Sequence, residues 1–168
     1  MEKAKALLIN KIHFLKEIYL YPMNSEVCKI FYTDDDMDDR DIFIDAANQV
    51  SDSLQIITQG NGDELIRILN NPPPYPHLIF LDLNMPIKNG YEVLQEIKQS
   101  ERTKNFPVIV FSTSDDEKAI NTARQLGANL YIPKPSSFSS LKKVIKYCLS
   151  INWDTFTPST ENFVYRAN

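Results

Sequence analysis

Short apolar runs alternate with amphipathic helical patterns along most of this chain. Apolar runs that predict strands occupy residues 27–33, 54–58, 77–81, 107–111 and 130–132. Between and after these runs, apolar residues recur at helical spacing, which predicts helices over 42–50, 63–70, 90–99, 116–126 and 138–149. This repeated strand–helix order is typical of an α/β domain.

Two of the predicted strands are apolar on both faces. Residues 78–81 (LIFL) and 108–111 (VIVF) offer no polar position that could face water. A strand of this kind belongs in a sheet that is covered on both sides, as parallel sheets in α/β proteins are. We therefore expect a five-stranded parallel sheet with helices on both faces.

Turn residues predict where two of the helices begin or end. Asp63 follows a Gly-Asn-Gly turn, and we expect it to cap the helix that runs through Asn70. Gly127 is expected to end the helix that begins near Asp116.

The two ends of the chain lie outside this pattern. Residues 3–20 have the spacing of an amphipathic helix, which Pro22 ends. This helix could pack on its own domain, form a dimer contact, dock a partner or, if Met23 is the natural start, be an upstream extension. Residues 152–168 are polar with scattered aromatics, and we expect them to lie across the surface, partly ordered. The predicted organisation is an N-terminal extension over 1–26, a domain over 27–150 and a tail over 151–168.

Charge and composition exclude several classes of function. The 168 residues carry a net charge of -4, whereas proteins that bind nucleic acid rely on a basic face. No apolar stretch approaches the roughly 18 residues that a membrane-spanning helix needs. Cys28 and Cys148 sit in no metal-binding motif, so we expect free thiols rather than a disulfide, in a reducing compartment and hence the cytoplasm.

Polar residues that could carry chemistry follow four of the predicted strands. Acidic residues Asp34, Asp35 and Asp36 come after the first strand, and Asp82 comes after the third. Ser112 follows the fourth strand, and Lys134 follows the fifth one residue later. Ligands of open α/β sheets bind beyond the carboxyl ends of the strands, so these side chains should meet at one edge.

This set of side chains suits phosphoryl chemistry that depends on a metal. Clustered carboxylates repel one another unless a cation intervenes, and hard oxygen ligands suit Mg²⁺, for which Mn²⁺ could substitute. An aspartate can act as a nucleophile toward phosphoryl groups. A lysine can pair with the developing charge, and a serine can hydrogen-bond a phosphoryl oxygen.

Each of these features also has a purely structural interpretation. Taken alone, residues 34–39 are typical of a solvated helix start, because acids there complement the helix dipole. Asp82 is harder to explain in this way, since it interrupts an apolar run where an unpaired carboxylate is costly. Lys134 alone would be a surface lysine, although the flanking Pro133 and Pro135 could fix its direction. The joint occurrence at strand ends is what favours a site.

Four segments resemble the receiver domain of two-component response regulators. The segment LIFLDLNMPIKNGYEVLQEIK is similar to the family's phosphoacceptor region, with Asp82, Pro86 and Gly90 in their expected places. KIFYTDDD resembles the acidic motif, PVIVFSTS the hydroxyl motif and GANLYIPKP the lysine motif. All four occur in the family's order, over about residues 27–150. The resemblance implies a flavodoxin-like sheet with strand order 2-1-3-4-5.

The resemblance also implies the ligands of a metal ion and the residue that is modified. Asp82 would be phosphorylated. Asp34 and Asp35 would hold Mg²⁺ together with Asp82, and the backbone carbonyl of Asn84 would complete the protein's ligands. Asn84 and Ser114 occupy positions that tune the phosphoryl lifetime in this family.

A switch is implied as well. Ser112 would bond the phosphoryl oxygen, Lys134 would pair with the phosphoryl group, and Tyr131 matches the family's switch aromatic. On phosphorylation Ser112 would move toward the phosphoryl group and Tyr131 would swing inward behind it. The face formed by 116–126, 130–132 and 138–149 would then change shape.

The implied role is that of a stand-alone, chemotaxis-regulator-like protein rather than an enzyme with a separate substrate. Only self-phosphorylation and self-dephosphorylation are expected. The phosphoryl donor would be a sensor histidine kinase or a histidine phosphotransfer protein. The output would be a contact with an unknown downstream protein, and a homodimer is possible. Ser112, where threonine is more usual, and the additional acids Asp36, Asp38 and Asp39 depart from the commonest pattern.

Three other interpretations stay open at this stage. A phosphatase of the haloacid-dehalogenase type would use Asp34 and Asp36, but Lys134 would then lie on the wrong side of Asp115–Asp116, and Asp82 would have no role. A receiver fold that no longer switches would serve only as a binding module. A flavodoxin-like cofactor protein would need a phosphate loop where this chain has acids.

Overall fold

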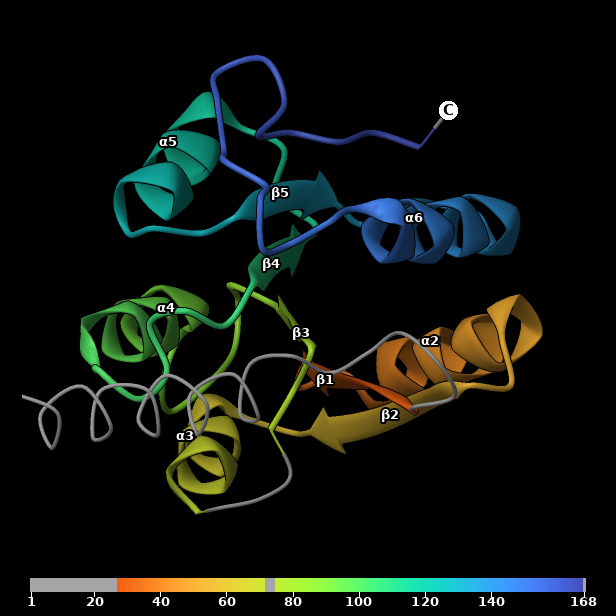
Figure 1. Ribbon diagram of the computed structural model, residues 1–168, viewed down its shortest axis with the longest axis horizontal. Helices are drawn as coiled ribbons and strands as arrows, with labels where there is room; N and C mark the ends of the chain where they lie inside the picture. The colour runs from red at the N-terminus through yellow and green to blue at the C-terminus, as the bar shows by residue number, and fades with distance from the viewer. Residues whose placement is uncertain (1–26, 72–74, 168) are drawn as a thin grey trace, which may run out of the picture.

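The computed structural model describes residues 27–71 and 75–167, and the predicted helix over 3–20 lies outside them. The described chain alternates strands and helices in the predicted order (Figure 1). The strands are β1 (Cys28–Thr33), β2 (Leu54–Gln59), β3 (Leu78–Leu81), β4 (Val108–Ser112) and β5 (Leu130–Pro133). The helices are α2 (Met37–Val50), α3 (Gly62–Asn70), α4 (Gly90–Gln99), α5 (Glu117–Gln125) and α6 (Phe138–Ser150).

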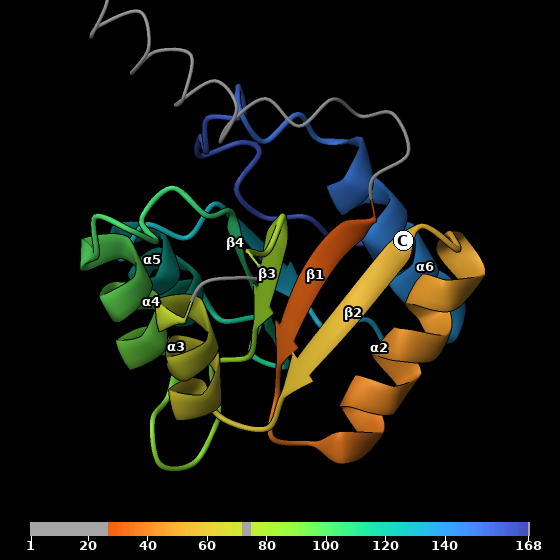
Figure 2. The ribbon, with the colours of Figure 1, turned by 60° about the horizontal axis from the view of Figure 1, so that its bottom comes forward.

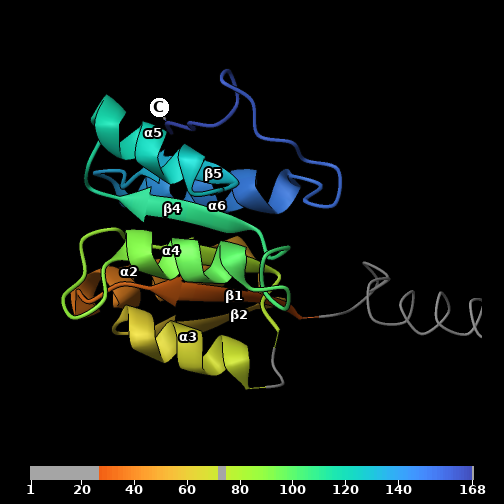
Figure 3. The same cartoon turned by 90° about the vertical axis from the view of Figure 1, so that its left-hand side faces the viewer.

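The strands form one parallel sheet in the order β2-β1-β3-β4-β5, which confirms the predicted fold class. Helices α3, α4 and α5 cover one face of the sheet, and α2 and α6 cover the other (Figures 1 and 3). Each face therefore has its own apolar core. Because β3 and β4 lie inside the sheet, every residue of both strands is buried, as their apolar sequences predict.

Polar side chains cap the helices where they leave the carboxyl edge of the sheet. Asp36 accepts hydrogen bonds from the backbone N–H groups of Asp38 and Asp39 at the start of α2. The prediction that Asp63 caps α3 is wrong, because the cap is Asn61, whose side chain accepts from the N–H of Glu64. Asp63 instead lies in the first turn of α3, where its charge complements the helix dipole.

A close backbone contact fixes the loop between β3 and α4. A Cβ atom placed on Gly90 would lie 2.1 Å from the carbonyl oxygen of Asp82, so only glycine fits there. The N–H of Gly90 donates to the carbonyl oxygen of Leu83, 3.0 Å away. This contact holds the start of α4 against the backbone of the candidate phosphoacceptor.

The C-terminal tail is packed more firmly than the sequence predicts. Val164 forms a parallel bridge with Tyr131 of β5, and the side chain of Phe163 is fully buried. Trp153 donates its indole N–H to the carbonyl oxygen of Cys148 at 3.0 Å. The expectation of a partly ordered surface segment is therefore wrong for the part around Phe163, which belongs to the core on the α3/α4/α5 face.

Candidate functional site

Adjacent strands β1 and β3 bring two buried aspartates together. Thr33 and Leu81 are register partners, so the next residues, Asp34 and Asp82, leave the sheet side by side. Figure 2 shows the arrowheads of β1 and β2 at this edge, where the chain turns into α2. Asp34 is 1% exposed and Asp82 is 4% exposed. Two ionised carboxylates in such a position repel each other, and this repulsion is unfavourable unless a cation offsets it.

Asp35 completes a group of three carboxylates. One oxygen each from Asp34, Asp35 and Asp82 lies within 4.8 Å of the others, and Asp35 is exposed to solvent. The buried Oδ1 atom of Asp82 has no hydrogen-bond partner among the described residues. A buried acceptor without a partner beside two further carboxylates fits a hard divalent cation such as Mg²⁺. The predicted acidic cluster is thus brought together as expected.

Burial controls the protonation of Asp82. Removal from water raises the pKa of this carboxyl group above its ordinary value. The ammonium group of Lys134 acts in the opposite direction, and the neighbouring charge of Asp34 raises the pKa further. Asp82 also accepts a hydrogen bond at Oδ2 from the N–H of Asn84, 3.0 Å away, which favours the charged form.

Lys134 reaches the cluster from the loop after β5. Its Nζ atom lies 2.6 Å from Oδ2 of Asp34, 2.7 Å from Oδ2 of Asp39 and 3.9 Å from Oδ1 of Asp82. Burial lowers the pKa of Lys134, but the hydrogen bonds to Asp34 and Asp39 outweigh this and raise it overall. The backbone N–H of Lys134 donates to the carbonyl oxygen of Ser112 at 2.8 Å, which ties the loop to the end of β4.

Ser112 ends β4 and is fully buried. Its Oγ atom accepts from the N–H of Ser114 at 3.3 Å and lies 3.5 Å from Nδ2 of Asn84. Because Asn84 also bonds Asp82 through its backbone, it links the hydroxyl group to the carboxylate. The structure therefore brings Ser112 and Asn84 to the site, whereas a metal-binding role for the Asn84 carbonyl stays a prediction.

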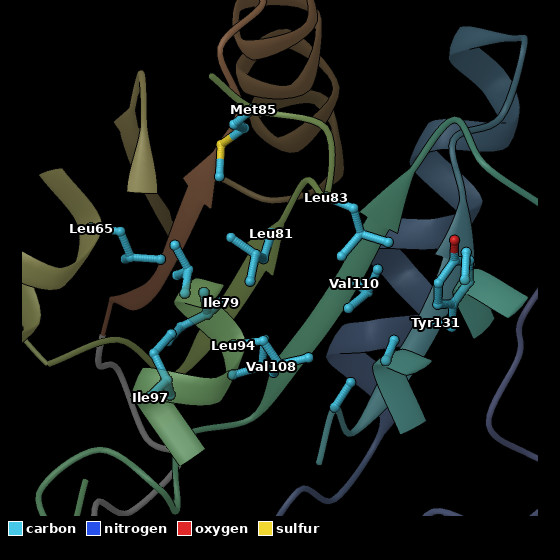
Figure 4. Packing of buried hydrophobic residues seen from close by; sticks show 14 of the residues in the cluster. Leu65, Ile79, Leu81, Leu83, Met85, Leu94, Ile97, Val108, Val110 and Tyr131 are labelled. Atoms are coloured by element: carbon cyan, nitrogen blue, oxygen red, sulfur yellow. The ribbon is translucent and has the colours of Figure 1, made fainter. Parts of the chain in front are cut away.

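Tyr131 is linked to the charged site through Ser114. Its side chain is fully buried at the edge of the core shown in Figure 4, and its hydroxyl group donates to the carbonyl oxygen of Ser114 at 2.8 Å. Burial raises the pKa of Tyr131 to about 12, so the hydroxyl group keeps its proton and remains a donor. Tyr131 thus contacts the same loop that carries Ser112 and Ser114.

Two residues at this site were given no role from the sequence. Asp39 was noted only as an additional acid, yet it binds Lys134 from the first turn of α2. Tyr32 donates its hydroxyl proton to Oδ2 of Asp34 from within β1. A cap at Asp36 would have placed Asp39 in the first turn, facing the sheet edge, so this position could be predicted. The partner of Tyr32 could not, because it depends on a side-chain direction.

The geometry also bears on the phosphatase interpretation. That interpretation pairs Asp34 with Asp36 as the catalytic acids, but the Oδ1 atom of Asp36 is engaged in capping α2. The carboxylates that gather with Asp34 are those of Asp35 and Asp82.

Within residues 27–71 and 75–167, no helix is long and apolar enough to cross a membrane.

Comparisons with known proteins agree with this site. Residues 30–146 match the response regulator receiver domain family. A probable chemotaxis protein CheY of Rhizobium etli is 30% identical over 122 residues, which cover 73% of this chain and 92% of that protein. Response regulator Rcp1 of Synechocystis is 40% identical over 84 residues, but these span 50% of this chain and only 57% of Rcp1.

Solved structures of regulators give the same result. The crystal structure of the phosphorylated cyanobacterial phytochrome response regulator RcpA is similar with a TM-score of 0.69 and 32% identity, over 80% of this chain and 98% of RcpA. The Mn²⁺-bound form of Rcp1 is similar with a TM-score of 0.66 and 30% identity, over 78% of this chain and 99% of Rcp1. With the matching residues gathered at one sheet edge, the chain belongs to the response regulator receiver domain family.

Proposed function

We propose that this chain is a phosphorylation-driven switch in which Asp82 accepts a phosphoryl group from a phosphohistidine. The donor would be a sensor histidine kinase or a histidine phosphotransfer protein, and the output would be a contact with another protein. The observation that carries the proposal is the buried carboxylate of Asp82, whose Oδ1 lies 3.9 Å from Lys134 Nζ and has no hydrogen-bond partner in the described part of the chain. A carboxylate oxygen of Asp82 would therefore act as the nucleophile beside a group that can bind the incoming phosphoryl oxygens.

The transfer conserves atoms and charge in a simple way. A carboxylate oxygen of Asp82 attacks the phosphorus atom, a new O–P bond forms, and the P–N bond to the donor imidazole breaks. The imidazole leaves with the electron pair of that bond and takes up a proton. Water later attacks the aspartyl phosphate and releases inorganic phosphate, which restores Asp82.

Asp34, Asp35 and Asp82, with the carbonyl oxygen of Asn84, would hold the metal ion. A bound Mg²⁺, for which Mn²⁺ could substitute, supplies positive charge against the phosphoryl oxygens. Structures of relatives support this assignment, since Rcp1 was solved with Mn²⁺ and RcpA in phosphorylated form. The hydrogen bond from Tyr32 orients Asp34 for such a role.

Lys134 and Ser112 would respond to the new group. Lys134 now binds Asp34 and Asp39, and a phosphoryl group on Asp82 would draw its ammonium group away from Asp39. Ser112 would turn its hydroxyl proton toward a phosphoryl oxygen. Because Ser114 bonds both Ser112 and Tyr131, this movement reaches the face formed by α5, β5 and α6. Asn84 and Ser114 border the site, where they would affect the lifetime of the phosphoryl group.

Intact mass spectrometry with acetyl phosphate and Mg²⁺ tests the proposal. We expect a Mg²⁺-dependent gain of one phosphoryl group that is absent in Asp82→Asn, whose side chain has nearly the same shape. Asp45→Asn, on the same chain but in the middle of α2, is the matched control and should retain the gain. An unmodified wild type would instead favour a receiver that no longer switches. Phosphate release that survives Asp82→Asn but not Asp34→Asn would favour a phosphatase.

The proposal also includes the cellular location and the assembly of the protein. Cys28 and Cys148 are both free thiols, as the sequence predicts, which is consistent with a reducing compartment. The cytoplasmic location and the homodimer remain predictions. Chemical crosslinking with and without acetyl phosphate would test the dimer.

A further inference from the structure

The C-terminal tail extends the sheet at one residue, and that residue is Tyr131. The N–H of Tyr131 donates to the carbonyl oxygen of Phe163 at 2.8 Å, and the N–H of Tyr165 donates to the carbonyl oxygen of Tyr131 at 3.0 Å. These bonds form the parallel bridge between Tyr131 and Val164. Figure 1 shows the tail, drawn in dark blue, returning past β5 between α5 and α6. Both backbone polar groups of Tyr131 that face the edge are thus occupied by the tail.

Side chains of the tail secure it to both flanking helices. The ring of Phe163 is fully buried, with its centroid 6.5 Å from that of Tyr131, and the guanidinium group of Arg124 in α5 lies 4.7 Å above it. The ring of Tyr165 stacks on Tyr147 of α6, with centroids 3.7 Å apart and planes 7° from parallel. Stacked rings and a cation over an aromatic face are favourable arrangements. The tail therefore bridges α5, β5 and α6.

The tail also contacts the loop that carries the phosphoryl-binding serine. Arg166 forms a two-point ion pair with Asp115, with Nε 3.3 Å from one carboxylate oxygen and an NH₂ group bonded to the other. Asp115 lies between β4 and α5, directly after Ser114. Ser114 in turn accepts the hydroxyl proton of Tyr131 and bonds Ser112. A closed chain of contacts thus runs from the tail through the loop to the site and back through Tyr131.

We propose that residues 163–166 are an intramolecular clamp that holds Tyr131 inward and thereby favours the phosphorylated form of the protein. The clamp rests on the proposed function, in which the inward position of Tyr131 accompanies phosphorylation. Tyr131 is already inward here, and Phe163 and Val164 lie across the edge of β5 beside it. A Tyr131 ring that turned outward would have to displace the tail. A contact made in only one of two states shifts the equilibrium toward that state.

Thermodynamic linkage allows the clamp to be tested in two ways, at Asp82 and at the tail. If the tail favours the phosphorylated form, then a phosphoryl group on Asp82 must strengthen attachment of the tail by the same factor. Beryllofluoride, which can occupy the phosphoryl position on an aspartate, is a suitable probe because it binds reversibly. Its affinity and the protection of the tail can be measured on the full chain.

The first experiment titrates beryllofluoride with Mg²⁺ and follows binding by fluorine NMR. We expect Phe163→Ala to weaken binding by about fivefold or more, which is the usual range of coupling between two sites. Phe156→Ala is the matched control, since Phe156 packs against Trp153 rather than Tyr131, and it should bind as the wild type does. In the Tyr131→Ala background, Phe163→Ala should have no further effect.

The second experiment needs no variant. Hydrogen exchange at the amides of Tyr131 and Tyr165, whose acceptors are Phe163 and Tyr131, reports attachment of the tail directly. We expect both amides to exchange more slowly once beryllofluoride is bound. Unchanged exchange, or equal affinity of Phe163→Ala and wild type, would overturn the clamp while leaving the proposed function intact. Tighter binding by Phe163→Ala would also overturn it and make the tail an inhibitory plug. Absence of beryllofluoride binding in the wild type would count against the proposed function itself.

Discussion

The acidic edge and the tail side of this molecule are built on opposite physical terms. At the acidic edge, Asp34, Asp82 and Lys134 place charge in a buried setting, and one carboxylate oxygen has no hydrogen-bond partner among residues 27–71 and 75–167. On the tail side, Tyr131 and Phe163 are buried with neutral hydrogen bonds and ring contacts. The buried charge of the acidic edge lowers the stability of the fold, whereas the packing of the tail side raises it. A cation or phosphoryl group that binds at the acidic edge therefore changes the charge balance next to a tail side that is already well packed.

The largest expected effect on stability comes from a substitution on the tail side. Phe163→Ala should lower the free energy of unfolding by about 3 kcal/mol, because it removes a fully buried aromatic ring. Phe156→Ala, in the same tail but only partly buried, should cost distinctly less. Urea unfolding of the three proteins measures both values. A loss below about 1 kcal/mol for Phe163→Ala would fit an exposed surface site instead.

Removing the ammonium group of Lys134 should lower the free energy of unfolding, because the carboxylates of the acidic edge then repel one another without compensation. Lys134→Met keeps the length of the side chain but leaves Asp34 and Asp39 without their shared partner. We expect a loss of about 2 kcal/mol in metal-free buffer, less than for a wholly buried pair because Asp39 is partly exposed. Addition of Mg²⁺ should recover part of this loss. An unchanged unfolding midpoint in both buffers would mean that Lys134 does not offset the carboxylate charge.

Neutralising Asp82, the proposed phosphoacceptor, should raise the free energy of unfolding rather than lower it. Asp82→Asn should raise the free energy of unfolding at pH 7 in metal-free buffer, because it removes a charge that burial and the neighbouring Asp34 disfavour. Burial raises the pKa of Asp82 above its ordinary value of 3.8, so the folded protein holds this proton more firmly than the unfolded chain does. The penalty of Asp82 is thus absent below pH 3.8 and grows as the pH rises through the folded-state pKa.

Unfolding of wild type and Asp82→Asn from pH 3 to 8 checks this sign. The two stability curves should converge at the acid end and separate as the pH rises. A wild type that becomes more stable than Asp82→Asn as the pH rises would instead mean that the pKa of Asp82 is depressed in the folded protein, with Lys134 outweighing burial.

The two regions also differ in how far the sequence predicts them. Asp82 and Lys134 could be placed because parallel strands bring their carboxyl ends to one edge, whatever the details of packing. The strands were predicted to within about a residue because each is a short apolar run, and the inner strands β3 and β4 are buried throughout. The cap of α3 was misplaced by two residues, since Asn61 and Asp63 are both good caps. In each case the signal lies within a short stretch of sequence.

The clamp could not be predicted from such a stretch. Phe163 and Tyr165 show no helical or strand periodicity, and their partners Tyr131 and Tyr147 precede them in separate elements. Contacts between segments without regular structure depend on the shape of the finished surface, which local patterns do not encode. The ion pair of Asp39 with Lys134 was also missed, because it joins residues 95 positions apart, although the cap at Asp36 would have placed Asp39 at the sheet edge. The charged residues at the strand ends could thus be predicted, whereas the ion pair of Asp39 and the contacts of the tail could not.

The smallest expected effect concerns backbone strain at the acidic edge. Ile87, in the loop between β3 and α4, has φ 70 and is 84% exposed, a conformation that branched side chains rarely adopt. The N–H of Lys88 donates to the carbonyl oxygen of Pro86 at 2.8 Å, so Ile87 is the centre of a tight turn. Ile87→Asn should raise the free energy of unfolding by about 0.5 kcal/mol, because asparagine tolerates positive φ. Ile87→Val keeps the branched Cβ and should give no gain in urea unfolding. An equal gain from both would show that the strain of this turn does not arise from the branched side chain, and the acidic edge would then owe its lower stability to charge alone.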